Sequence, residues 1–184
     1  MILNFSQTRG AIPVIPEAVF VALEACVTQD RATAMIGAAW VMAEAFTGRN
    51  YWPVTAAELT ADASESLEIY WPRFPAPAAV TVERLQGRLW VADDGPWWDR
   101  GRLFFCAPGA RYRITQTGTL TPPEPGANVL EAVRGLALYS LIHSPARREF
   151  REVQSGDSTL TREALGGLFQ ASGAGLMLAT EVRW

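Results

Sequence analysis

Hydrophobic residues recur every three or four positions over two stretches near the start of the chain, the spacing of one face of a helix. The first stretch covers residues 17–26, and Pro16 stands where a first helical residue is tolerated. The second is rich in alanine and covers residues 30–46, with Asp30 placed to cap it and Gly48 placed to end it. The large apolar residues at this spacing are Val19, Phe20, Leu23, Cys26, Val27, Ile36 and Trp40. The pattern predicts two consecutive helices.

After Gly48 the pattern changes to short runs of β-branched and aromatic residues separated by proline and glycine, which favours strands. The step Gln86-Gly87 between two of these runs indicates a hairpin. The sequence TPPEPG at residues 121–126 interrupts the pattern, because its three prolines lack an N–H donor and fix φ. The predicted strands cover residues 51–60, 66–71, 79–85, 88–91, 103–106 and 111–117. Residues 1–15 form a mixed lead with no predicted element.

The clearest helical pattern covers residues 127–143 and meets its boundary at Pro145. The charged residues that follow could continue as a solvated helical turn, and residues 155–158 are predicted to form a loop. A short helix is possible at 161–169, before a segment of small and apolar residues that reaches the end of the sequence.

These elements predict an α+β fold in which a bundle-like core of three to four helices carries an inserted, small antiparallel β region. We expect a single domain over residues 1–184, the size that one hydrophobic core usually serves. Its helices would cover about 16–46 and 127–152, its β insertion about 51–117, and an extended C-terminal segment about 155–184.

Composition narrows the function classes. Apolar residues make up 49% of the chain, but the longest apolar runs are too short for a membrane span. The first ten residues do not have the pattern of a secretory signal, so we expect synthesis in the cytoplasm. Every basic residue is arginine, and the net charge of −3 disfavours tight binding to DNA phosphates.

Four segments, in this order, resemble the head–tail connector adaptors of long-tailed phages and their relatives in gene transfer agents. AFTGRNYWPVT (45–55) is similar to a family helix ending before the first strand, and WPRFPAPAAVTVERL (71–85) to a proline-framed segment leading into a strand. Residues 111–149 resemble the family's strand, T-x-G turn, proline loop and long helix. SGAGLMLATEVRW (172–184) resembles its closing pattern, with Thr180-Glu181 where a Pro-aromatic step is usual.

The resemblance implies a non-enzymatic structural subunit that forms a ring of about twelve copies between the portal and the stopper or tail, around a channel for DNA. It also implies assembly at the head–tail interface of a virion or gene transfer agent particle. A stopper or tail-terminator subunit is the nearest alternative. The C-terminal segment would dock on the portal through Leu168, Phe169, Ser172, Gly173, Ala174, Leu176, Met177, Leu178, Arg183 and Trp184.

Tryptophan and arginine often dominate the energy of protein interfaces, and most of the seven tryptophans lie near prolines and turns. A small satellite core beneath long loops would also explain them. Contacts with a neighbouring subunit or the stopper are predicted for Trp97, Trp98, Arg147, Arg148 and Arg151. For the three arginines, a solvated ion-pair face is an alternative reading, and DNA contact a weaker one.

Residue types that carry catalysis are few. His143, the sole histidine, could be a general base in a hydrolase, but we favour a cap that interacts with the C-terminus of its helix or an ordinary packed imidazole. Asp93, Asp94 and Asp99 flank Trp97 and Trp98, as in a sugar-binding site, although acidic turn residues beside buried indoles account for the same pattern.

The glycine-containing stretches at 166–167 and 172–175 lack the features of a phosphate-binding loop. They suit either close helix packing or a segment that becomes ordered on docking. Cys26 and Cys106 are not spaced as metal ligands, and we expect buried free thiols. No catalytic residue, metal or cofactor is therefore predicted.

Overall fold

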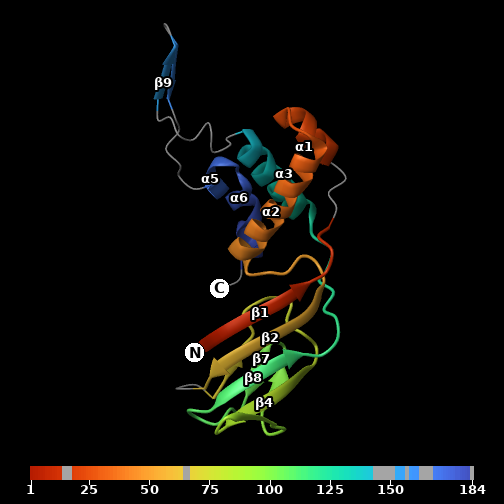
Figure 1. Cartoon of the computed structure of the whole chain (residues 1–184), viewed down its shortest axis with the longest axis vertical. Helices are drawn as coiled ribbons and strands as arrows, with labels where there is room; N and C mark the ends of the chain where they lie inside the picture. Colours follow the sequence, from red (N-terminus) through yellow and green to blue (C-terminus); the bar gives the residue numbers. More distant parts are fainter. Residues whose placement is uncertain (14–17, 64–66, 143–151, 156–157, 162–167, 183–184) are drawn as a thin grey trace. The chain divides into compact units, whose positions relative to one another are not determined.

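The computed structural model describes residues 1–13, 18–63, 67–142, 152–155, 158–161 and 168–182. The chain divides into two compact units. Unit 1 comprises Met1–Pro13 and Gly48–Glu124, and unit 2 comprises Val14–Thr47 and Pro125–Trp184. The predicted α+β class is confirmed, with the strands of the five- and three-stranded sheets in unit 1 and the helices in unit 2 (Figure 1). A single adaptor domain stays a prediction.

Unit 1 contains a five-stranded antiparallel sheet in the order β1-β2-β8-β4-β5. Figure 1 shows β1, β2, β8 and β4 of this sheet side by side. A second sheet has three antiparallel strands in the order β3-β7-β6. The bounds are β1 Ile2–Arg9, β2 Val54–Asp62, β3 Ile69–Tyr70, β4 Val80–Gln86, β5 Leu89–Ala92, β6 Trp97–Asp99, β7 Arg102–Phe104 and β8 Arg111–Gln116.

The core of unit 1 joins these two sheets. Alternate residues of β2 and β8, among them Leu59, Tyr112 and Ile114, are buried. They belong to one hydrophobic cluster with Ile69 and Leu103 of the three-stranded sheet. The alternation of buried and exposed positions is that of strands with one face against a core. The predicted hairpin is confirmed by the pairing of Gln86 with Leu89.

Two strands of unit 1 were not predicted. The strand β1 lies within residues 1–15, for which no element was predicted. Its core-side positions Phe5, Gln7 and Arg9 include only one apolar residue, so the sequence shows no strand pattern there. Its pairing with β2 through partners such as Phe5 and Leu59 supplies the order that its own pattern does not. The strand β6 was interpreted as a turn, because Gly95 and Pro96 directly precede it.

Unit 2 contains α1 Ala18–Ala25, α2 Gln29–Thr47 and α3 Ala127–Ile142, which confirm the three helical patterns of the sequence. The residue after α2 is Gly48, whose φ of +70° is the left-handed conformation that often ends a helix. The core of the unit lies between α2 and α3 and includes Trp40, Val133 and Leu136, each with no exposed surface. Trp40 thus packs in the helical core, as its position in the second helical pattern predicted.

The remaining described parts of unit 2 follow α3. β9 (Glu152–Ser155) and β10 (Ser158–Thr161) form an antiparallel pair, so the helical turn considered after residue 145 does not extend to Glu152. α5 (Leu168–Ala171), α6 (Ala174–Leu178) and the 3-10 helix η1 (Ala179–Glu181) come next. The C-terminal stretch that the sequence suggested to be extended is therefore helical between 168 and 181. Residues 143–151, with His143 and the three arginines, lie outside the described residues.

No helix among the described residues has the length and apolar character needed to cross a membrane.

Candidate functional site

The predicted portal-docking residues on α6 divide into two pairs by burial, whereas the described members before α6 are half-buried. Ala174 and Leu178 have no exposed surface, because α6 packs against α3. Leu176 on the same short helix is 87% exposed, and Met177 is 39% exposed. The first pair therefore fills the core of unit 2, and the second pair is free to contact another protein.

The junction between α5 and α6 is fixed by close packing. Gly173 adopts a left-handed φ of +73°, which lets the chain turn sharply between the two helices. Ser172 donates a hydrogen bond to the carbonyl oxygen of Leu168 at 2.7 Å. A Cβ atom at Gly135 of α3 would lie 3.3 Å from the carbonyl oxygen of Ser172. Within the stretch 172–175, close helix packing fits Gly175, where a Cβ atom would lie 3.3 Å from the carbonyl oxygen of Phe169, whereas Gly173 has open space around it. The stretch 166–167 lies outside the described residues.

Two further contacts anchor this segment to unit 2. The ring of Phe169 stacks on that of Phe46 of α2, with 4.4 Å between ring centroids. The side chain of Asn128, at the start of α3, donates a hydrogen bond to the carbonyl oxygen of Met177 at 3.2 Å. Arg183 and Trp184 lie outside the described residues. The docking role of the whole set stays a prediction, but these contacts determine which of its members can take part.

A second candidate surface is the outer face of the three-stranded sheet, where aromatic side chains gather. We call Tyr70, Trp97, Phe104 and Phe105 the aromatic ladder. Trp97 is paired with Phe104 across β6 and β7, and their rings stack with 5.4 Å between centroids. The guanidinium of Arg102 lies 5.0 Å from the centroid of the Tyr70 ring.

Three members of the aromatic ladder are largely exposed: Tyr70 by 52%, Trp97 by 56% and Phe105 by 71%. Phe105 also has a φ of +61°, a conformation that costs a non-glycine residue about 1 kcal/mol. Exposed aromatic rings beside an arginine have the composition of interface hot spots.

Trp98 differs from its neighbour because successive side chains of a strand point to opposite faces. Its indole N–H donates a hydrogen bond to the carbonyl oxygen of Pro77 at 3.0 Å, and its ring meets Trp71 edge to face at 5.9 Å. Trp98 therefore packs against the core of unit 1, whereas Trp97 faces outward. The contact role predicted for the pair stays untested, and its geometry suits Trp97 alone.

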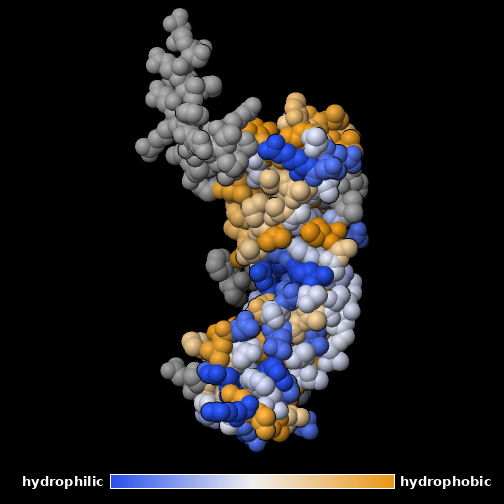
Figure 2. Space-filling model, in the orientation of Figure 1, coloured by the Kyte–Doolittle hydropathy of each residue, from blue (hydrophilic) through white to orange (hydrophobic). Residues whose placement is uncertain are grey.

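A third surface was missed by sequence reasoning. On α1, Val21 and Ala22 are buried, while Val19, Phe20 and Leu23 are 48%, 58% and 69% exposed. The latter three were expected to form the packed face of this helix. Figure 2 shows hydrophobic residues gathered over α1. The signal was in the sequence, because every residue of this helix except Glu24 is apolar, and such a helix needs cover on more than one side.

Two of the three acidic residues near Trp97, Asp93 and Asp99, make local contacts. Asp93 accepts a hydrogen bond from the backbone N–H of Gly95 at 3.1 Å and lies 3.4 Å from the guanidinium of Arg84. Asp99 lies 4.0 Å from its neighbour Arg100. These contacts are those of acidic turn residues. Sugar binding at this site stays an untested alternative.

The two cysteines are free thiols, as expected, but the prediction that both are buried is wrong for Cys26. Cys26 is exposed, while Cys106 is 1% exposed in the core of unit 1. Burial, aided by the negative charge of Asp93, raises the pKa of Cys106 to about 11. A thiol in this state is a poor nucleophile near neutral pH. Among the described residues, no group of three His, Cys, Asp or Glu side chains could hold a metal ion.

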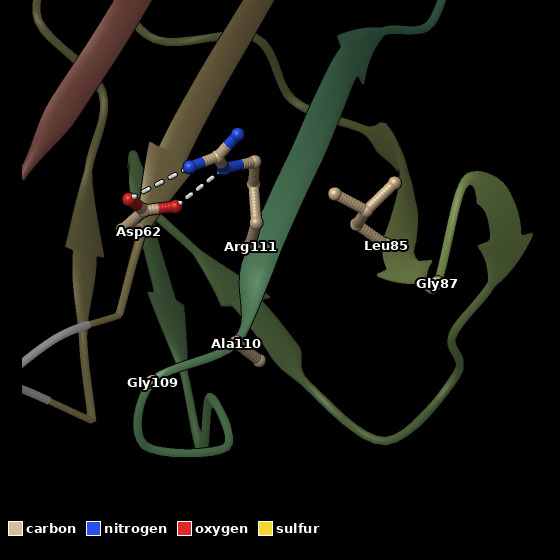
Figure 3. A pocket seen from close by; sticks show the side chains of 6 residues that line it. All are labelled: Asp62, Leu85, Gly87, Gly109, Ala110 and Arg111. Carbon is tan, nitrogen blue, oxygen red and sulfur yellow. Dashed lines mark hydrogen bonds and ion pairs between the residues drawn. The ribbon is translucent and has the colours of Figure 1, made fainter.

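A shallow, open depression of about 390 Å³ in unit 1 is lined by Asp62, Leu85, Arg111 and three small residues. Figure 3 shows Arg111 and Asp62 joined across the strands, with nitrogen–oxygen distances of 2.7 and 3.3 Å. The hydrogen bond from Arg111 lowers the pKa of the Asp62 carboxyl, and the same bond raises the pKa of Arg111. Because these charges satisfy each other, the depression offers no free charged group to a ligand.

Comparison with known proteins gives a likeness of fold. No family model matches the sequence, and neither does any curated protein sequence. A chain from the neck of an empty gene transfer agent (GTA) particle, computed with C6 symmetry, is 15% identical, with a TM-score of 0.58. A chain from the neck of a native GTA particle, computed with C12 symmetry, is 14% identical, with a TM-score of 0.50. Each likeness covers 99% of this chain and 96% of the other. The protein thus has the fold of a chain found in the neck of gene transfer agent particles.

Proposed function

We propose that this protein is a structural adaptor subunit of a phage-like or gene transfer agent particle. Copies would form a ring of about twelve subunits that joins the portal to the stopper or tail. The single observation that carries this proposal is the likeness to GTA neck chains over 99% of the sequence. The chain would be made in the cytoplasm and assembled at the head–tail interface.

The exposed surfaces support a role in assembly. The α1 face, the aromatic ladder and the pair Leu176–Met177 each leave large apolar side chains in water. Such groups mark contact sites when they cluster, because their burial in an assembly is favourable by about 25 cal/mol per Å². We assign Leu176 and Met177 to the portal, and Trp97 to a neighbouring subunit or the stopper.

Passage of DNA fits the charge of the chain. A net charge of −3, repeated on every copy, would repel the phosphates of a duplex in the channel. No specific DNA contact is proposed, and the role requires no catalytic residue or cofactor.

The test is retention of the chain by the matching portal protein in a pull-down. Removing everything after Gln154 would be a poor variant, because it would also remove the buried Ala174 and Leu178 from the core of unit 2. Leu176→Asp changes only an exposed side chain. A docking anchor contributes about 2 kcal/mol, so its loss should weaken portal binding about thirtyfold.

The matched control is Leu67→Asp, which changes a 53% exposed leucine in a loop of unit 1. We expect it to bind the portal like the unchanged chain. Equal binding by Leu176→Asp would remove the docking role of this side chain. Failure of the unchanged chain to bind the portal would remove the adaptor role itself, and binding to the tail side instead would favour the stopper or tail-terminator alternative.

A further inference from the structure

The two outer strands of the five-stranded sheet each have an unpaired edge. In the described part of the chain, β1 pairs only with β2, and β5 pairs only with β4. Their outer backbone N–H and C=O groups are therefore open to another strand. The outer strands β3 and β6 of the other sheet have only two and three residues, and β6 ends at Asp99.

Neither edge carries the charged side chains or prolines that often protect a sheet from pairing with another chain, although β5 is short and the pairing of β1 with β2 is irregular near both ends. Natural edge strands are commonly blocked by charged side chains or proline. In β1 the single charged residue is Arg9, at its end, and the strand contains no proline. β5 has the sequence LWVA, with neither charge nor proline. Both edges are thus chemically suited to accept a strand.

Apolar side chains reach both edges on the core side of the sheet, beside the polar Gln7 and Arg9 of β1. On β1, Ile2 and Phe5 pair with the buried residues Ala61 and Leu59, which places them on the core side. On β5, Val91 is placed there by its partner Arg84, which pairs in turn with the buried Tyr112. At the edges this layer is uncovered, with Ile2 46% and Val91 40% exposed.

The direction of the strands makes the two edges compatible with each other. Each step in the order β1-β2-β8-β4-β5 is antiparallel, so β1 and β5 run in the same direction. A second copy related by rotation can therefore place its β5 beside β1 as a parallel neighbour. Its core side then falls on the same side of the joined sheet, which brings Ile2 and Phe5 beside the partner copy's apolar edge.

We propose that β1 of one copy pairs with β5 of the next, so that the five-stranded sheets continue across the subunit boundaries of the ring. This contact is head to tail: each copy offers its β1 edge to one neighbour and its β5 edge to the other, as a closed ring of many copies requires. The inference rests on the proposed ring and names the strands that would join its subunits. β5 limits the seam to four residues, so the seam is weak by itself and acts with other subunit contacts.

Disulfide trapping tests the seam, because a covalent bond accumulates even from a weak contact. In a Cys26→Ser background of the full chain, Ala92→Cys is combined in turn with Asn4→Cys, Ser6→Cys and Thr8→Cys. All four positions are exposed and lie on the outer side of the sheet. The three combinations cover the possible registers, which differ by two residues on one side of a strand.

A bond within one chain is excluded by distance. Four strand spacings separate β1 from β5, about 19 Å, whereas a disulfide joins Cα atoms less than about 7 Å apart. At least one combination should therefore give a ladder of cross-linked dimers, trimers and larger species under mild oxidation. The control Thr115→Cys with Ala92→Cys places the thiol on the central strand β8 and should give no ladder.

The seam is overturned if none of the three combinations gives more cross-linked species than the control. A Ser6→Cys variant without the Ala92→Cys change that forms cross-linked dimers but no larger species overturns the seam too, because such dimers indicate that β1 pairs with β1 of a single partner copy. Electron microscopy of the unmodified protein and the portal pull-down decide the proposed function separately. Rings without a ladder would refute the seam and leave the adaptor role intact.

Discussion

Leu178 provides the sharpest test of where the C-terminal segment belongs. Its side chain has no exposed surface, and it lies on α6, which packs against α3. Leu178→Ala removes three carbon groups and leaves a cavity between helices, which together cost about 3 kcal/mol. Leu176→Ala on the same helix removes the same atoms from a side chain that is 87% exposed, and should change the free energy of unfolding by less than about 0.5 kcal/mol.

The assay is urea denaturation of both variants, followed by far-UV circular dichroism. The α-helices of the described residues all lie in unit 2, so the helical signal reports the unfolding of that unit. With a slope of about 2 kcal/mol/M, Leu178→Ala should lower the urea midpoint by about 1.5 M. Equal midpoints for the two variants would refute the packing described for α6 and would make the segment a detached arm.

Two further predictions concern unit 1. Trp98→Ala should lower the free energy of unfolding by about 3 kcal/mol, because it removes an indole that packs against the core and donates a hydrogen bond to Pro77. Trp97→Ala should change the free energy of unfolding by less than about 1 kcal/mol, because its ring is largely exposed. Thermal unfolding compares the two variants, and a larger loss for Trp97→Ala would contradict the assigned faces. A thiol reagent near neutral pH should label Cys26 quickly and Cys106 only after unfolding, and rapid labelling of both would contradict the burial of Cys106. Folding raises the pKa of Cys106 from 9.0 to about 11, so the protonated thiol contributes its full stability below pH 9, and this contribution is lost as the pH rises toward 11. Urea titrations over this pH range should therefore show a smaller loss of stability for a Cys106→Ala variant than for the unchanged chain.

The buried state of Ala174 and Leu178 also changes how the C-terminal segment can act. A segment that becomes ordered only on docking has a conformational entropy cost to overcome at that moment. Here the helices at 168–181 are already held by Phe46, Asn128 and the close approach of Gly135. Leu176 and Met177 are therefore presented on a preformed support, which lowers the ordering cost for these two residues.

The sequence alone determined the helices and most strands of this protein. Apolar residues that recur every three or four positions placed α1, α2 and α3, since burial of one helical face requires that spacing. Runs of β-branched and aromatic residues between prolines and glycines indicated β2, β4, β5 and β8 within a few residues. The order of four motifs suggested the connector adaptor resemblance, and the fold likeness to GTA neck chains agrees with it.

Only the tertiary structure decided which side of each element is covered. The pattern of α1 could not separate Val21, which is buried, from Phe20, which is exposed, because every residue of the helix except Glu24 is apolar. Likewise, Trp97 and Trp98 are identical in type and adjacent, and β6 turns one outward and the other inward. Even the existence of β1 depended on its partner β2, since a strand is stabilised by hydrogen bonds to residues far away in the chain. Local sequence sets backbone preference and spacing, whereas exposure depends on what the rest of the chain brings alongside.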